Sequence, residues 1–252
     1  MNYYMKNNGI SNEKRLVEEI NGKTILEVNS NIRSFLKELF GNIDEEVPFK
    51  ASLFTRTAKP DIYITYKNRM KFISVKSGKT DAMHLERIKD FILFLRELGV
   101  SKETQKTILL FHYGDGTLTG EGKVRKPYEE LINEMKNQIK KANEELNSSK
   151  IITEMFYRSA IKGNEYRSNG VDYFYYGNAE YGVYTSKEEL LSFILRKKHY
   201  SFNTIHIGPM TIQPYLRDVN HHSKNTFKRE FVQVKWHYFL ADMENAKCVF
   251  RV

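Results

Sequence analysis

"KPDIYITYKNRMKFISVKSG", residues 59–78, decides the fold expected for this chain. Two runs with alternating apolar residues, 61–66 and 71–76, are separated by a short polar turn and are typical of a β-hairpin. Neither strand needs an aspartate directly after a proline at its start, or a lysine between serines near its end. Asp61 and Lys76 therefore indicate chemistry at one end of this hairpin.

The overall composition predicts a globular protein with a basic surface. The 252 residues carry a formal net charge of +9 and are 40% hydrophobic, and the mean hydropathy is −0.56. This charge favours a polyanionic partner, with nucleic acid first and an anionic membrane surface as the alternative. We find no apolar run long enough to span a bilayer, no signal peptide and no lipidation signal, so we expect a cytoplasmic (intracellular) protein without a membrane partner. The single Cys248 excludes an internal disulfide and a multi-cysteine zinc site.

Hydrophobic periodicity predicts an alternation of helices and strands along the whole chain. In the first half we expect a helix over 13–40, strands over 47–57, 61–66 and 71–76, a helix over 80–98 and a strand over 107–112. In the second half we expect a charged helix over 127–149, tyrosine-rich strands over 172–177 and 180–185, a helix over 187–198, and strands over 204–213 and 231–240.

The residues at the ends of the hairpin strands suit phosphodiester chemistry. Cleavage of a phosphodiester needs a cation that polarises the phosphate and lowers the pKa of the attacking water. Magnesium prefers oxygen ligands and keeps several waters, so one or two carboxylates and a backbone carbonyl can hold it. Strand pairing would place the Asp61 carboxylate beside the Lys76 ammonium, with the Val75 carbonyl between them. A lysine there can orient the water and offset charge on the phosphorus.

Pro60-Asp61, the hairpin and Ser74-Val75-Lys76 together resemble the signature of the PD-(D/E)XK nuclease superfamily, which includes many type II restriction endonucleases. The expected order of helix, strands, helix and strand is also similar to that family's core. Ser74 stands where the family usually has an acid. A subgroup of restriction enzymes is similar in this respect and supplies the missing carboxylate from a glutamate on the next helix. Here that residue would be Glu86, with Asp81 as the alternative.

The resemblance implies a role for each of these residues. Asp61 would be the central metal ligand, Glu86 the second ligand, and Lys76 the residue that positions or activates the water. The Val75 carbonyl would complete the site, and the metal would be Mg²⁺, with Mn²⁺ as a substitute. The residues expected in supporting roles are Ser74, Ser77, His84 and, on the first helix, Glu27.

Basic residues and amides of the C-terminal half predict a surface that contacts DNA. Arg, Asn and Gln pair with base edges, and Lys attracts phosphates. The expected DNA contacts are Arg217, Asn220, His221, His222, Lys224, Lys228, Arg229 and Lys235. A metal site at the paired histidines is not favoured, because adjacent residues of a strand point to opposite sides.

These features favour an α/β (α+β) protein with a central mixed β-sheet flanked by helices and a restriction-endonuclease-like core. We expect the nuclease core in residues 1–120, and a C-terminal region, 121–252, that completes the sheet and contacts DNA. The expected function is Mg²⁺-dependent cleavage of double-stranded DNA by a homodimer, as in a sequence-specific type II restriction endonuclease with a partner methyltransferase. The alternatives are an inactive DNA-binding protein on the same fold, or a nuclease acting on RNA or on branched or repair DNA.

Overall fold

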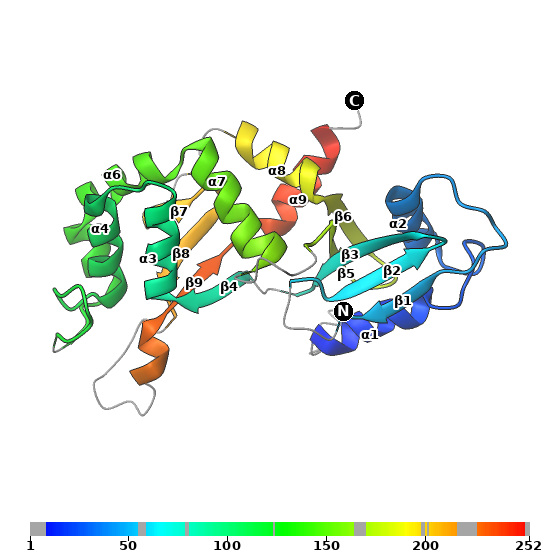
Figure 1. The fold of residues 1–252 in the computed structure, drawn as a ribbon, viewed down its shortest axis with the longest axis horizontal. Helices are drawn as coiled ribbons and strands as arrows, with labels where there is room; N and C mark the ends of the chain where they lie inside the picture. The colour runs from blue at the N-terminus through cyan, green and yellow to red at the C-terminus, as the bar shows by residue number, and fades with distance from the viewer. Residues whose placement is uncertain are drawn as a thin grey trace, which may run out of the picture. The chain divides into compact units, whose positions relative to one another are not determined.

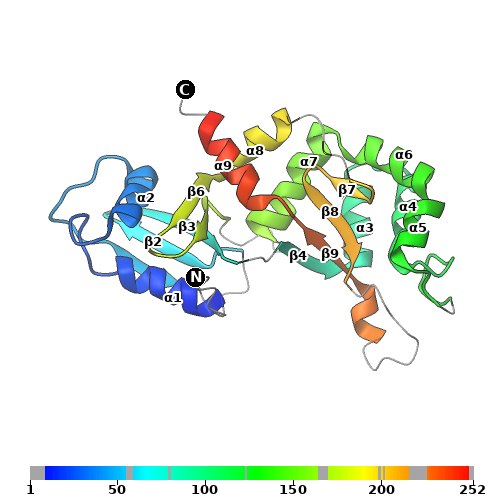
Figure 2. The same cartoon turned by 180° about the vertical axis from the view of Figure 1, so that it is seen from behind.

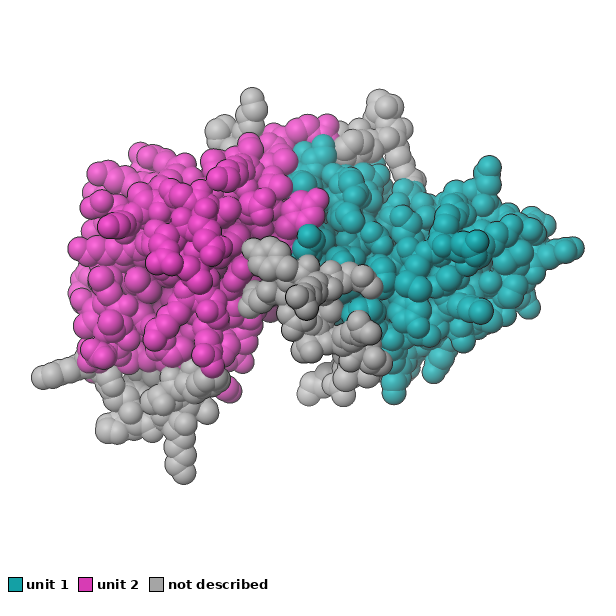
Figure 3. Space-filling model, viewed as in Figure 1, with its two compact units in different colours: residues 1–80, 160–193, 239–252 teal, residues 81–159, 194–238 magenta. Residues whose placement is uncertain are grey.

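The computed structural model describes residues 9–54, 59–78, 81–122, 124–163, 170–197, 200, 202–215 and 226–249. The chain divides into two compact units, which Figure 3 distinguishes by colour. Unit 1 comprises residues 1–80, 160–193 and 239–252, and unit 2 comprises residues 81–159 and 194–238. The boundary expected near residue 120 falls inside unit 2, because the chain leaves unit 1 after residue 80 and returns to it twice.

Unit 1 is built on a mixed sheet of five strands in the order β1-β2-β3-β5-β6 (Figure 1). The strands are β1 (Lys50–Leu53), β2 (Ile62–Tyr66), β3 (Arg69–Lys76), β5 (Tyr173–Gly177) and β6 (Gly182–Ser186). β3 and β5 are parallel, and every other pair of neighbours is antiparallel. The expected hairpin is confirmed as β2 and β3, and the tyrosine-rich strands are confirmed as β5 and β6.

Helices pack against both faces of this sheet. α1 (Gly9–Ile20) and α2 (Ser30–Phe40) share one hydrophobic core with side chains of β2, β3 and β5, among them Val75 and Tyr175. Phe174 points to the opposite face because successive strand residues alternate, and its ring contacts Phe239 of α9 (Phe239–Val249) at a centroid distance of 5.4 Å. The central mixed sheet of unit 1 is therefore flanked by helices.

The single helix predicted over 13–40 is wrong, because a turn separates α1 from α2. Gly22, with φ of +78°, lies in this turn in a conformation that glycine adopts without strain. Asn29 then starts α2 by accepting a hydrogen bond from the Ile32 N–H at 2.9 Å. The predicted strand 47–57 is shorter in the structure, and its residues 55–57 lie outside the described part.

Unit 2 contains an antiparallel sheet of four strands in the order β4-β9-β8-β7. The strands are β4 (Ala82–Arg87), β7 (His206–Ile207), β8 (Met210–Pro214) and β9 (Phe231–Lys235). The helices around it are α3 (Ile88–Glu97), α4 (Lys102–Tyr113), α5 (Tyr128–Glu134), α6 (Lys136–Leu146) and α7 (Ser149–Phe156). Figures 1 and 2 show α3 and α4 lying along one face of the sheet.

Three further segments complete the element order. α7 continues into a π-helical segment, η1 (Tyr157–Lys162), and β9 is preceded by a 3₁₀ segment, η2 (Thr226–Glu230). α8 (Lys187–Arg196) begins directly after β6, as the sequence predicted.

Two predicted elements of unit 2 are wrong. The start of the predicted helix over 80–98 is instead β4, which pairs with β9, and the helix α3 begins only at Ile88. The predicted strand over 107–112 lies inside α4. Its β-branched and aromatic residues resemble a strand, but Ser101 caps the helix by accepting from the Thr104 N–H, and Gly114 ends it at φ +63°.

Two smaller corrections concern the ends of predicted elements. The charged helix expected over 127–149 is interrupted at Met135 and ends at Leu146, so that it forms α5 and α6. The strand expected over 231–240 ends at Lys235, and a turn then leads into α9.

Candidate active site

The backbone around Asp61 is fixed between two neighbouring strands of unit 1. Asp61 directly precedes β2, and its N–H donates to the carbonyl of Ile73 on β3 at 2.9 Å. Its own carbonyl accepts a hydrogen bond from the Phe54 N–H, just beyond β1, at 2.9 Å. Pairing on both sides therefore holds the Asp61 Cα in place at the end of the hairpin, as the sequence predicted.

The Asp61 carboxylate is directed at the end of β3. Its Oδ2 accepts hydrogen bonds from the Val75 N–H at 2.6 Å and from the Ser74 hydroxyl at 3.1 Å. The Lys76 Nζ lies 3.7 Å from the same oxygen, and the Asp61 and Lys76 side chains are 23% and 26% exposed. The structure thus brings Asp61, Ser74, Val75 and Lys76 together, with the carboxylate and the ammonium accessible to solvent.

Ser74 acts on Asp61 as a hydrogen-bond donor. Its side chain is buried, at 3% exposure, and its hydroxyl orients the carboxylate. An acid at this position would instead place a second negative charge beside Asp61. Because the N–H and C=O of a strand residue point to the same edge, we expect the Val75 carbonyl to lie on the Asp61 side of β3. Ser77 follows β3 directly and is partly exposed.

Glu13 on α1 is a second acid near this group, and the sequence analysis missed it. Partial burial raises the pKa of Glu13, the Asp61 carboxylate raises it further, and the Lys76 ammonium lowers it. Both charges therefore lie close enough to Glu13 to affect its ionisation. A signal was available, because Glu13 precedes the buried Leu16 and Ile20 by three and seven residues, which puts an acid on the apolar face of α1.

Glu27, the acid expected from the first helix, lies in the turn between α1 and α2 and is exposed. Its carboxylate accepts a hydrogen bond from the Thr24 N–H at 2.7 Å, and this bond lowers the pKa of Glu27. Its predicted place on the first helix is wrong, because the prediction assumed one continuous helix over 13–40.

Glu86 is engaged within unit 2. It lies on β4 and not on a helix, and its side chain is buried. Arg158 donates to both carboxylate oxygens, with an Nη2–Oε2 distance of 2.6 Å, and His84 Nε2 lies 3.4 Å from Oε1. Burial alone would raise the pKa of Glu86, but the hydrogen bonds from His84 and Arg158 outweigh it and hold the pKa below its usual range. His84, expected in a supporting role at the nuclease site, is thus a partner of Glu86.

Asp81, the alternative second ligand, also has partners within unit 2. Its carboxylate lies 3.2 Å from Lys235 Nζ and 2.6 Å from His237 Nδ1. Burial would raise the pKa of Asp81, but the hydrogen bond and charge of Lys235 lower it overall. Lys235, one of the expected DNA contacts, is therefore paired with an acid in this structure.

The other expected DNA contacts divide into two groups. Those that lie outside the described residues are Arg217, Asn220, His221, His222 and Lys224. Lys228 is described and exposed, and its Nζ lies 5.9 Å from the centre of the Tyr215 ring.

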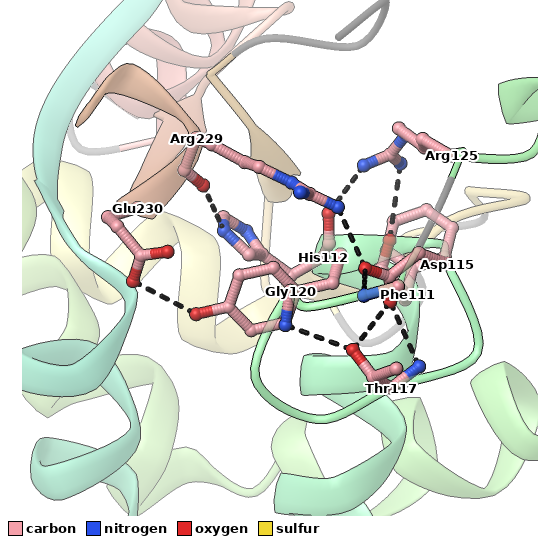
Figure 4. A network of polar contacts seen from close by, with 10 residues as sticks. Phe111, His112, Asp115, Thr117, Gly120, Arg125, Arg229 and Glu230 are labelled. Carbon is pink, nitrogen blue, oxygen red and sulfur yellow. Dashed lines mark hydrogen bonds and ion pairs between the residues drawn. The ribbon is translucent and has the colours of Figure 1, made fainter. Parts of the chain in front are cut away.

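Arg229 belongs to a polar network that joins η2 to the end of α4 (Figure 4). Its guanidinium lies 2.8 Å from Asp115 Oδ2, and its carbonyl accepts a hydrogen bond from His112 Nε2 at 2.9 Å. Arg125 donates to the last carbonyls of α4, those of Phe111 and His112. Because its charge is already matched by Asp115, Arg229 has a structural explanation in this arrangement.

No protein-family model matches this chain, and a search of curated proteins finds no relative. Within the described part of the chain, no helix is long and apolar enough to cross a membrane. Over the same residues, no three His, Cys, Asp or Glu side chains gather closely enough to hold a metal ion. The function therefore has to be argued from the Asp61 group and the sheet that carries it.

Proposed function

We propose that unit 1 is a divalent-metal-dependent nuclease that hydrolyses phosphodiester bonds of DNA at Asp61 and Lys76. The observation that carries this proposal is the convergence of the Asp61 carboxylate, the Ser74 hydroxyl and the Lys76 ammonium at one end of the β2–β3 hairpin. A structural ion pair would explain Asp61 and Lys76 alone. An ion pair alone would not explain the second carboxylate, that of Glu13, since the Asp61 charge raises the pKa of Glu13 and so disfavours its ionisation.

The architecture of unit 1 supports a restriction-endonuclease-like core. The resemblance implies a helix, three strands, a helix and a strand. Unit 1 has α1 and α2, then β1 to β3, then the helical segment η1 leading to β5, which is parallel to β3. Unit 2 supplies the residues between β3 and η1. We propose that the family's core lies in the three segments of unit 1 and that unit 2 is inserted into it at two places, with residues 81–159 between β3 and β5 and residues 194–238 between β6 and α9.

The residues at the site fit a magnesium ion. Mg²⁺ takes oxygen ligands and is commonly held by only one or two carboxylates with several waters. Asp61, Glu13 and the Val75 carbonyl provide oxygen donors of this kind, and Mn²⁺ takes the same donors. When bound, the ion would polarise the phosphate and lower the pKa of the attacking water. Glu13 takes the role first assigned to Glu86, which is matched by Arg158.

Each side chain then has a defined task in hydrolysis. The attacking water forms a bond to phosphorus as the bond from phosphorus to the leaving sugar oxygen breaks. Lys76 would hold that water in line and offset the negative charge that develops on the phosphoryl oxygens. Ser74 would keep the Asp61 carboxylate in its orientation through the hydrogen bond at 3.1 Å.

The test is incubation of plasmid DNA with the purified full chain, in Mg²⁺ or in EDTA. We expect cleavage only with the metal, and a loss of about 100- to 1000-fold in rate for Lys76→Ala and Asp61→Asn. Lys71→Ala is the matched control, because Lys71 lies on the same strand with its Nζ 5.9 Å from the Tyr173 ring centre. Cleavage that survives Lys76→Ala, or that is equally lost in Lys71→Ala, would refute the assignment.

A second candidate is a DNA-binding protein without catalysis. Ser74 in place of an acid, and the lack of a group of three metal-ligating side chains among the described residues, favour it. Its signature would be salt-sensitive binding of DNA with no metal-dependent cleavage of DNA, RNA or branched substrates.

A restriction role makes two further demands on the protein. Cutting both strands of a symmetric site needs two equivalent active sites, so we propose a homodimer. It also implies a partner methyltransferase that protects the host DNA. Discrete fragments from one sequence, and a dimer in sedimentation with that DNA, would support this role. Cutting without sequence preference would favour a repair or structure-specific nuclease.

A further inference from the structure

Unit 2 contains a cavity that none of the proposed catalytic residues lines. Its volume is about 970 Å³, and its walls come from α5, α6, α7, the last turn of α8 and the segment that leads from α8 to β7. This volume exceeds what a single metal ion or small anion needs and falls within the range of ligand-binding pockets. All the residues that line the cavity belong to unit 2.

One wall is a helical face of amides and lysines. Asn133, Lys136, Asn137 and Lys140 follow one another at spacings of three, one and three residues, which places them on the same side of consecutive helical turns. The interruption at Met135 keeps helix-type hydrogen bonds, because its N–H bonds to the Leu131 carbonyl at 2.9 Å and its carbonyl accepts from the Ile139 N–H at 2.8 Å. All four side chains are exposed. This wall therefore presents positive charge and hydrogen-bonding groups to the cavity.

Another part of the cavity lining is aromatic. The rings of Tyr200 and Phe202 are nearly parallel, with an angle of 4° and a centroid distance of 6.5 Å. Tyr238 extends this stack, at 22° and 6.3 Å from Phe202. Lys197 Nζ lies 4.8 Å from the centre of the Tyr200 ring, which adds a third lysine to the cavity. Aromatic rings next to a lysine can bind a ligand in which a planar ring is attached to a negatively charged group.

Two asparagines hold the walls together. The Asn143 side chain donates to the Thr204 carbonyl and accepts from the His206 N–H, both at 3.0 Å. Asn147 accepts from the Gly208 N–H at 2.7 Å and donates to the His206 carbonyl at 3.1 Å. Because these bonds tie α6 to β7, the shape of the cavity is fixed before any ligand binds.

We propose that this cavity binds a single-stranded segment of nucleic acid. Its bases would stack on Tyr200 and Phe202, and its phosphates would pair with Lys136, Lys140 and Lys197. Aromatic platforms bind bases that are free of a duplex, because paired bases already stack on each other. The proposal rests on unit 1 acting on nucleic acid, and it adds the form of the strand that unit 2 holds.

The charge of unit 2 favours a polyanion over a peptide or a neutral sugar. Unit 2 has 21 Lys and Arg residues against 15 Asp and Glu, although it accounts for only about half of the chain. The residues that line the cavity include three lysines and two acids, Glu129 and Glu144. A neutral oligosaccharide would use the aromatic rings and amides but would gain nothing from the lysines.

The experiment measures binding of a labelled single strand of about 12 nucleotides to the full chain in EDTA, by fluorescence anisotropy over a range of salt. The key comparison is Lys140→Glu against Lys141→Glu. The two lysines are adjacent on α6 and both exposed, but only Lys140 lines the cavity. We expect Lys140→Glu and Lys136→Glu to weaken binding at least tenfold, and the salt slope to fall by about 0.7 for each lysine removed. Lys141→Glu should change the affinity much less.

Phe202→Leu tests the stacking wall. It keeps an apolar side chain, and we expect a loss of about 5- to 100-fold in affinity for the single strand. An unfolding temperature close to that of the wild-type chain shows that each variant is folded. Equal effects of Lys140→Glu and Lys141→Glu, or equal binding of a blunt duplex and a single strand by the wild-type chain, would overturn the inference.

This result is separable from the proposed function of unit 1. Binding in EDTA that depends on the cavity, with no cleavage in Mg²⁺, would refute the nuclease and support the cavity. Cleavage that needs Lys76, with binding indifferent to the cavity variants, would support the nuclease and refute the cavity.

Discussion

The Asp61 carboxylate of unit 1 and the Glu86 carboxylate of unit 2 are held in opposite ways. Asp61 accepts from a backbone N–H and a serine hydroxyl, and the Lys76 ammonium lies 3.7 Å from the same oxygen. Glu86 is buried and accepts two hydrogen bonds from one guanidinium. These described contacts of Asp61 all fall on Oδ2. Our proposal therefore places the metal ion at the first carboxylate, because the second already contains its counter-ion.

The same contrast holds for the basic residues. Arg158 and Arg229 are each matched by an acid within unit 2, and their side chains are 13% and 16% exposed. Lys76 is more accessible and more loosely paired. Charge pattern alone therefore does not locate a site: the buried pairs have a structural explanation, and our proposal assigns chemistry to the loosely held pair.

Removing the cation from the buried Glu86–Arg158 pair should cost the most stability. Arg158→Met keeps an apolar chain that can pack near the Phe94 ring, which lies 4.6 Å from the guanidinium carbon, but leaves Glu86 buried without its cation. We expect a loss of about 3–5 kcal/mol in the free energy of unfolding, measured by urea denaturation. Lys76→Ala should cost no more than about 1 kcal/mol, because that pair is solvent-accessible.

The double variant Glu86→Gln/Arg158→Met sharpens this test. Removing both charges leaves no buried ion to solvate, so the double variant should be more stable than Arg158→Met alone. If Arg158→Met and Lys76→Ala destabilise the protein equally, the distinction between the two carboxylates fails.

The next effect concerns His112, which is buried in the network at the end of α4. Burial, followed by the charges of Arg125 and Arg229, lowers the pKa of His112 to about 4. The unfolded chain therefore takes up a proton near pH 6.5, whereas the folded chain resists it until about pH 4. Stability that is complete above pH 6.5 should fall by about 3 kcal/mol as the pH drops through this window.

His112→Gln provides the check, because glutamine can still donate a hydrogen bond to the Arg229 carbonyl but does not titrate. Urea denaturation between about pH 7 and pH 4 should show a shallower loss of stability in this variant than in the wild-type chain. Parallel pH profiles would contradict the assignment of a neutral, buried His112.

How much of this could be read from the sequence depended on the separation of the residues along the chain. Asp61 and Lys76 lie on adjacent strands of one hairpin, so local alternation and a short turn were enough to bring them together. Glu86 and Arg158 are 72 residues apart, and β4 finds its partner in β9. No local pattern contains such a pairing, and the apolar spacing that continues from β4 into α3 extended the predicted helix too far. Glu13 was missed because its relation to Asp61 depends on how α1 packs.

A smaller effect concerns the activity of the site itself. Glu13→Gln removes the second carboxylate while keeping the size of the side chain, and we expect cleavage to slow by about 10- to 100-fold at fixed Mg²⁺. Raising the Mg²⁺ concentration should recover part of this loss if Glu13 helps to hold the ion. Glu86→Gln should leave the metal dependence of cleavage unchanged in the fraction that remains folded. If Glu86→Gln changes the metal dependence of cleavage and Glu13→Gln does not, Glu86 would again be the second ligand.

A small gain in stability is expected from Glu13→Gln. The pKa of Glu13 is raised by partial burial and by Asp61, so its ionised form is disfavoured in the folded protein relative to the unfolded chain. Above its folded pKa this cost is fully present, and it disappears as the pH falls below the ordinary glutamate value. Glu13→Gln should therefore melt at a slightly higher temperature than the wild-type chain at pH 7, and the difference should vanish below about pH 4. Added Mg²⁺ should stabilise the wild-type chain more than Glu13→Gln, since the ion would offset the repulsion that the variant lacks. A variant that melts at a lower temperature at pH 7 would mean that a partner stabilises the Glu13 carboxylate. The contrast with the buried, paired Glu86 would then apply to Asp61 but not to Glu13.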